Sequence, residues 1–123
     1  MTSPLTEGKH TEEFLLSEVP DMARETYTLA SGQNVVDGQV LKDNGSGKAI
    51  AAAGTHNTAG TSTETIIGVV CGNWNVSADT VVPYIARLAT VKDSAMTYHT
   101  GGADAAKKAA VKAALKDLLI IQR

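Results

Sequence analysis

Four large aliphatic residues, Leu118 to Ile121, stand only two residues before the end of this chain at Arg123. Chain ends are usually polar and poorly ordered. An apolar segment in this place has to be packed, either in the chain's own core or against another subunit, and the residues alone leave both alternatives open. Leu118, Leu119, Ile120 and Ile121 are therefore candidate core or interface residues.

The segment before this ending, about residues 104–117, is rich in alanine and lysine and is predicted to form a helix. On a helical projection Val111 and Leu115 form a bulky apolar stripe, and alanines cover the sector beside it. Small alanine side chains allow a second surface to approach closely. We therefore add Val111 and Leu115 to the candidate core or interface residues.

Three lysines of this helix, Lys108, Lys112 and Lys116, fall on one narrow strip. They could meet phosphate groups or form a solvated face. The formal net charge of −2 gives no global basic field, so a solvated face is the better explanation, and neither nucleic acid nor an anionic membrane is an expected partner. No apolar run approaches the roughly 20 residues that a membrane-spanning helix needs.

The middle of the chain predicts several short strands separated by turns rich in glycine, asparagine and threonine. The segment from Thr65 to Cys71 is the clearest strand, and because it is apolar on both faces we expect it to be central in a sheet. The dipeptide Asp37-Gly38 predicts a tight turn with a positive φ. The predicted fold is mainly β (α+β), a small β-rich domain over residues 25–123 with one C-terminal helix.

Residues 1–24 have the composition of an extended, flexible N-terminal arm, with many charges, prolines and a glycine. One apolar island, Phe14-Leu15-Leu16, interrupts it. An apolar island in a charged arm is expected only if it is buried against another surface. Either a partner binds the island or it packs back on its own domain, and the sequence does not choose between these alternatives.

Residues able to carry chemistry are scattered along the chain. The three histidines share no metal-ligand spacing, and no serine stands in a nucleophile motif. Cys71, the one cysteine, follows an apolar strand, where a buried, inert thiol is the better interpretation. We expect no catalytic residue, cofactor or metal site. Trp74, in a turn between two asparagines, is either an interface anchor or an ordinary half-buried aromatic residue.

A set of short motifs recurs along nearly the whole chain in the order and spacing of one known family. The motifs are Glu13-Phe14-Leu15-Leu16-Ser17-Glu18, Arg24-Glu25-Thr26, Thr28-Leu29-Ala30-Ser31-Gly32-Gln33, Gly38-Gln39-Val40-Leu41, the loop from Gly60 to Glu64 leading into Ile67-Gly68-Val69, Ala113-Ala114-Leu115 and Ile120-Ile121-Gln122-Arg123. Together they resemble the head decoration proteins of tailed phages of the lambda protein D type. The chain departs from the ending expected for that family at Leu119, where a glycine is expected, and at Gln122, where a valine is expected.

The resemblance implies a structural protein rather than an enzyme. It would be made in the host cytoplasm and bind as a homotrimer to the outer surface of the virion head, at local threefold axes. Its partner would be the major capsid protein of the expanded shell, which it would stabilise against the pressure of packaged DNA. Phe14, Leu15 and Leu16 would belong to an arm that becomes ordered on the capsid.

Two other classes of protein stay open at this point. One is a small oligomeric enzyme or ligand-binding domain with its site at subunit interfaces. The other is an accessory module of a phage fibre or baseplate. Neither is favoured by a particular group of residues, because no site constellation stands out in the sequence.

Overall fold

The computed structural model describes residues 14–19, 22–102 and 104–123. Most of the regular structure in these ranges is β, and the predicted mainly β class with one C-terminal helix is confirmed. The elements are β1 (Leu15–Glu18), β2 (Arg24–Leu29), β3 (Asn34–Val35), β4 (Val40–Asp43), β5 (Ala49–Ala51), β6 (Ile66–Val70), β7 (Trp74–Asn75), β8 (Thr80–Ile85), β9 (Ala89–Val91), a 3-10 turn (Asp93–Ala95), α1 (Ala105–Asp117) and β10 (Ile120–Gln122).

Five strands close into a small barrel in the order β2-β5-β4-β6-β8. Strand β6 pairs with both β4 and β8, as its apolar character on both faces predicted. Closure depends on one parallel register pair, Leu29 with Ala49, between β2 and β5. The short strands β3 and β7 form a separate two-stranded sheet.

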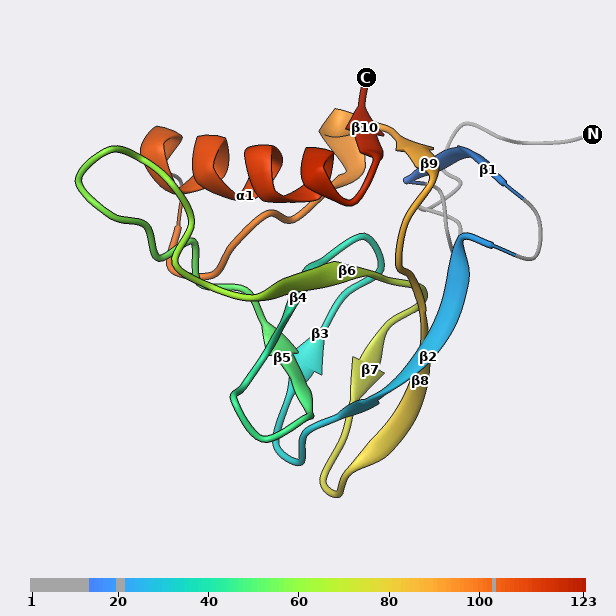
Figure 1. Ribbon diagram of the computed structural model, residues 1–123. Coiled ribbons are helices and arrows are strands. Elements are labelled where there is room, and N and C mark those ends of the chain that lie inside the picture. The colour runs from blue at the N-terminus through green and yellow to red at the C-terminus, as the bar shows by residue number, and fades with distance from the viewer. Residues whose placement is uncertain (1–13, 20–21, 103) are drawn as a thin grey trace, which may run out of the picture.

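The second part of the fold, here called the terminal layer, consists of α1 and a three-stranded sheet in the order β1-β9-β10. Helix α1 lies across one end of the barrel, and its C-terminal end turns directly into β10 (Figure 1). Strand β10 runs parallel to β9, with Ile120 opposite Ala89. Within the chain, the aliphatic ending thus adds a strand to a sheet of its own domain, while Leu119 stays exposed.

One buried cluster joins the terminal layer to the barrel. Phe14, Val111, Leu115 and Ile120 from the terminal layer are fully buried together with barrel residues such as Val69. A second cluster, which includes Leu29, Leu41 and Val82, fills the barrel itself. The two parts of the fold thus share one apolar core and are expected to unfold together.

Local signals explain where the helix and one tight turn lie. The Asp104 carboxylate accepts hydrogen bonds from the N–H groups of Ala106 and Lys107, at 3.0 and 3.1 Å, and so caps the first turn of α1. The predicted positive φ is present at Gly38, at 86°. A β carbon at Gly38 would lie 2.7 Å from the carbonyl oxygen of Ala95 and 3.3 Å from Cβ of Phe14, so this turn has room only for glycine.

Candidate functional site: surfaces for assembly

Both ends of the described chain are tied to two neighbouring residues. The N–H of Lys92 donates to the carbonyl oxygen of Phe14 at 2.6 Å, and the N–H of Asp93 donates to the carbonyl oxygen of Arg123 at 2.9 Å. Phe14, the first described residue, and Arg123 therefore lie close together. Anything that binds one end lies close to the other.

The residues of the apolar island have different environments. Phe14 is fully buried in the shared core, and Leu15 is half-buried against it. Leu16 is 52% exposed on the edge strand β1, which pairs with β9. Residues 14–18 therefore form part of the folded domain, and Leu16 lies on its surface. Residues 1–13 of the predicted arm lie outside the described residues.

The residues of the aliphatic ending alternate between core and surface. Ile120 is fully buried, Leu118 and Ile121 are half-buried, and Leu119 is 57% exposed. Leu119 also has a left-handed backbone, with φ of 61°. Glycine adopts this conformation without strain, which accounts for the glycine expected at this position from the resemblance.

Two lysines of the predicted strip are engaged within the domain. The Asp93 carboxylate lies 3.2 Å from Nζ of Lys112 and 3.9 Å from Nζ of Lys108, and it accepts a hydrogen bond from the Tyr98 hydroxyl. Nζ of Lys108 and Nζ of Lys112 also lie over the Tyr98 ring, at 5.3 and 5.7 Å from its centre, respectively. The hydrogen bond from Tyr98, followed by that from Lys112, lowers the pKa of Asp93 below its usual value. This cluster fastens α1 to the turn that holds both chain ends.

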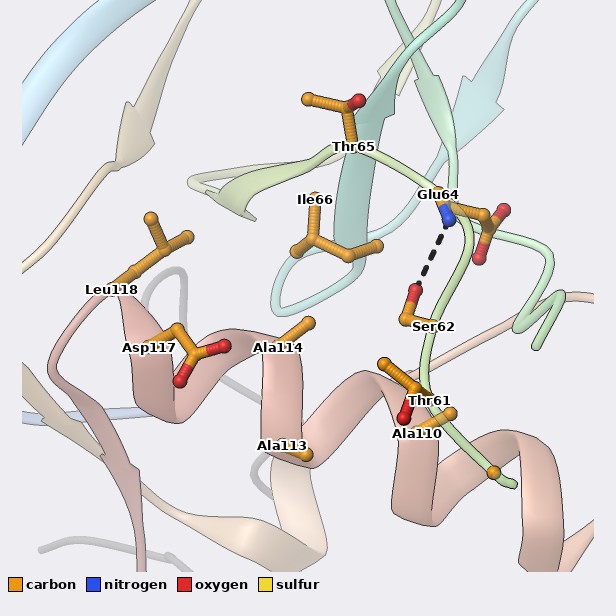
Figure 2. Close-up of a pocket in the computed structure, with 11 residues that line it drawn as sticks. Thr61, Ser62, Glu64, Thr65, Ile66, Ala110, Ala113, Ala114, Asp117 and Leu118 are labelled. Atoms are coloured by element: carbon orange, nitrogen blue, oxygen red, sulfur yellow. Dashed lines mark hydrogen bonds between the residues drawn. The ribbon is translucent and has the colours of Figure 1, made fainter. Parts of the chain in front are cut away.

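A groove lies between the 60–66 loop and α1 (Figure 2). It encloses about 360 Å³, and alanines line its helical side. Ile66 and Leu118 are the larger apolar side chains, and Asp117 is a charged group beside Leu118. None of the lining residues is a histidine, cysteine or lysine. The lining thus combines small and apolar side chains of the helix with the polar side chains of Thr61, Ser62, Glu64 and Thr65 in the loop.

Glu64 organises the loop on the other side of this groove. Its carboxylate accepts hydrogen bonds from the N–H groups of Ala53, Gly54 and Thr55, at 2.8 to 3.1 Å, and pairs with Nζ of Lys42 at 2.8 Å. Figure 2 shows this carboxylate turned away from α1. Burial alone would raise the pKa of Glu64, but the bonds from Lys42 and the backbone outweigh it and lower that pKa. Its role is to hold backbone in place.

Trp74 lies in β7 and is half-buried against the cluster that fills the barrel. Its ring N–H donates to the carbonyl oxygen of Cys71 at 2.8 Å, so its polar atom is satisfied within the chain. Cys71 itself is buried. Trp74 is thus placed apart from the terminal layer, on the small β3–β7 sheet.

The described ranges hold no group of three or more His, Cys, Asp and Glu side chains placed to bind a metal ion. Their helical part includes no segment long and apolar enough to cross a membrane.

A closed barrel of short strands with a helix across one end, and with Phe14 and Arg123 bonded to neighbouring residues, defines a small β-rich domain. The sequence model of one family, the bacteriophage lambda head decoration protein D, matches residues 4–120. The chain belongs to this family of phage head decoration proteins, which are structural proteins of the capsid. No curated protein matches the chain.

Sequence reasoning missed the two polar residues that organise these surfaces. Glu64 stands in a loop rich in glycine and threonine, and only its isolation as an acidic residue there could have drawn attention to it. Asp93 lies after a β-rich run, with no spacing that relates it to Lys108 or Lys112. Both act through contacts between segments far apart in the chain, which no local pattern records.

Proposed function

We propose that this protein binds as a homotrimer to the outer surface of the expanded phage head, at local threefold axes, and stabilises the shell against the pressure of packaged DNA. The observation that carries the proposal is the family match over residues 4–120. The partners would be the major capsid protein and two further copies of this chain.

The arrangement of the chain ends supports a role for the N-terminal segment in attachment. Residues 1–13 precede Phe14, which is buried in the shared core and whose carbonyl oxygen accepts from the N–H of Lys92. An extended segment anchored in this way can add as a strand to an exposed sheet edge of the capsid protein. Backbone hydrogen bonds would supply the affinity, and the folded domain would stay outside the shell.

Stabilisation of the shell would follow from mass action. A protein that binds the expanded lattice and not the unexpanded one shifts the equilibrium toward the expanded lattice. Three arms on one trimer would bind together, so that weak single contacts add up to firm attachment. The same contacts repeated over the shell would oppose its rupture.

The test is binding of the purified protein to expanded and unexpanded shells of the phage that encodes it, followed by sedimentation and electron microscopy. We expect density at the threefold axes of expanded shells only, and a trimeric mass for the protein by light scattering at high concentration. Removal of residues 1–13 should leave the unfolding midpoint unchanged and weaken binding. Equal binding to both kinds of shell, or none to either, would contradict the proposal.

A further inference from the structure

Two leucines carry the backbone strain of the described chain. Leu88 and Leu119 have φ angles of 55° and 61°, and every other described residue with a positive φ is a glycine. A side chain on the β carbon clashes with the backbone in this left-handed region, so a bulky residue there costs free energy that glycine would not. Strain of this kind persists where the side chain is needed.

Backbone hydrogen bonds bring the two strained residues together. The N–H of Leu88 donates to the carbonyl oxygen of Leu118 at 3.3 Å, and the N–H of Ala89 donates to that of Leu119 at 3.2 Å. On the other side of Leu88, its carbonyl oxygen accepts from the N–H of Val19 at 3.0 Å. The strain is therefore concentrated at one corner of the β1-β9-β10 sheet.

This corner exposes apolar side chains from three segments. Leu119 is 57% exposed, Val19 41% and Met22 53%, and the N–H of Met22 donates to the carbonyl oxygen of Val19 at 3.2 Å. We call Val19, Met22, Leu88 and Leu119 the apolar corner. Burial within the domain does not offset the strain at Leu119, because more than half of its side chain faces solvent.

Two exposed ion pairs lie beside the apolar corner. The Glu18 carboxylate accepts two hydrogen bonds from Nε of Arg24 and one from Nη2 at 2.8 Å, and Glu25 pairs with Arg87. Arg87 also donates to the carbonyl oxygen of Met22 at 2.6 Å. Lys116 and Asp117, which precede Leu118 and Leu119, are also exposed. A surface that fits this corner is therefore apolar over the exposed Val19, Met22 and Leu119 and polar where it meets these two charged side chains.

The place where the undescribed N-terminal segment joins the domain indicates what covers the corner. Phe14 follows residues 1–13 and stands directly before β1, and Val19 stands directly after β1. Phe14 and Val19 are therefore about 16 Å apart at ~3.3 Å per residue. If that segment is held by the shell protein, as proposed above, the apolar corner lies within reach of the same protein.

We propose that the apolar corner is a second docking surface, which seats an apolar patch of the major capsid protein at the end of β1 opposite to Phe14. This inference rests on the proposed function and adds a contact made by the folded domain. Leu119 is its central residue, because the chain carries a strained leucine where glycine would give a more stable monomer.

The test uses two variants of the full chain, Leu119→Gly and Leu119→Asn, because both residues tolerate a left-handed backbone. We expect each to raise the melting temperature by a few degrees, or leave it unchanged, and to weaken binding to expanded empty shells by about tenfold or more, the loss expected when a buried leucine contact is removed. Val81→Thr is the matched control, because Val81 is 61% exposed on β8 in the barrel. It should leave shell affinity unchanged.

Different outcomes separate the two proposals. Wild-type protein that binds expanded shells, with both Leu119 variants binding equally well, overturns the apolar corner alone. A lower oligomer mass for the variants by light scattering, at unchanged affinity per trimer, assigns the corner to contacts between copies of this chain and overturns the shell assignment. Wild-type protein that fails to bind overturns the proposed function and this inference together.

Discussion

The barrel and the terminal layer differ in whether their strands leave free sheet edges. The barrel closes on itself, and the described strands that form it leave no free edge. The terminal layer keeps two edge strands, β1 and β10, gathers both chain ends, and holds the two strained leucines. A closed barrel resists unwanted pairing, while open edges offer places for contact. Under the proposed function, the barrel would supply stability and the terminal layer would supply the contacts with the shell.

The largest expected effect tests whether the two regions are separate. Phe14→Ala removes a fully buried side chain from the core that they share, and should lower the free energy of unfolding by about 3–5 kcal/mol. Denaturant unfolding followed by both tryptophan fluorescence and circular dichroism should shift as one transition. Leu16→Ala, at a side chain that is 52% exposed, is the control and should change little. A neutral Phe14→Ala would mean that the arm begins after Phe14.

An intermediate effect tests the loop on the barrel side. Glu64→Gln places an amide where the carboxylate accepts three backbone N–H groups, and should cost about 1–3 kcal/mol. Hydrogen exchange should accelerate at Ala53, Gly54 and Thr55. Glu25→Gln is the control, since Glu25 belongs to an exposed ion pair with Arg87 worth ~0–1 kcal/mol.

The same variant has a defined pH signature. The pKa of Glu64 is lowered in the folded state from 4.5, so its contribution to stability is complete above that pH and is lost as the pH falls through the folded-state pKa. Wild-type protein should lose stability across this acid range more steeply than Glu64→Gln. Parallel acid curves for the two proteins would show that the carboxylate is not the group responsible.

The smallest effect concerns the cluster that fastens the helix in the terminal layer. Asp93→Asn should lower the free energy of unfolding by about 0.5 kcal/mol, because its ion pairs with Lys108 and Lys112 are partly exposed to solvent.

The titration of Tyr98 tests the same cluster. Burial and the hydrogen bond to Asp93 both raise the pKa of Tyr98 above 10.0. Tyr98 therefore stabilises the fold below pH 10, and this contribution is lost as the pH rises through its folded-state pKa. Phenolate absorbance should therefore appear at lower pH in Asp93→Asn than in wild type, with Tyr98→Phe identifying the ring. An unchanged titration would remove Asp93 from this role.

The elements that could be predicted are those with a complete local signal. The helix predicted over about 104–117 is found at Ala105–Asp117, because alanine propensity, the capping Asp104 and the apolar stripe all act within one segment. The central strand predicted from Thr65 to Cys71 is found at Ile66–Val70 for a similar reason, since apolar residues on both faces suit a strand with neighbours on both sides.

The pairings that define the architecture had no such signal. The parallel pairing of β10 with β9 and the closure of the barrel between Leu29 and Ala49 join segments whose partners are not specified by any nearby residue. The surfaces depend on the same kind of contact. Phe14 is apolar in an otherwise polar segment, which suits both of the alternatives given above, and only the space beside Gly38 shows where it lies.

The attachment of both chain ends to Lys92 and Asp93 also decides how the domain would carry mechanical load. A pull applied at Phe14 in the direction of β1 would load the β1–β9 hydrogen bonds in shear, so that several would have to break at once rather than one after another. The buried ring of Phe14 would have to leave the core in the same step. Tension applied at Phe14 would therefore act on the whole domain before β1 could separate from β9.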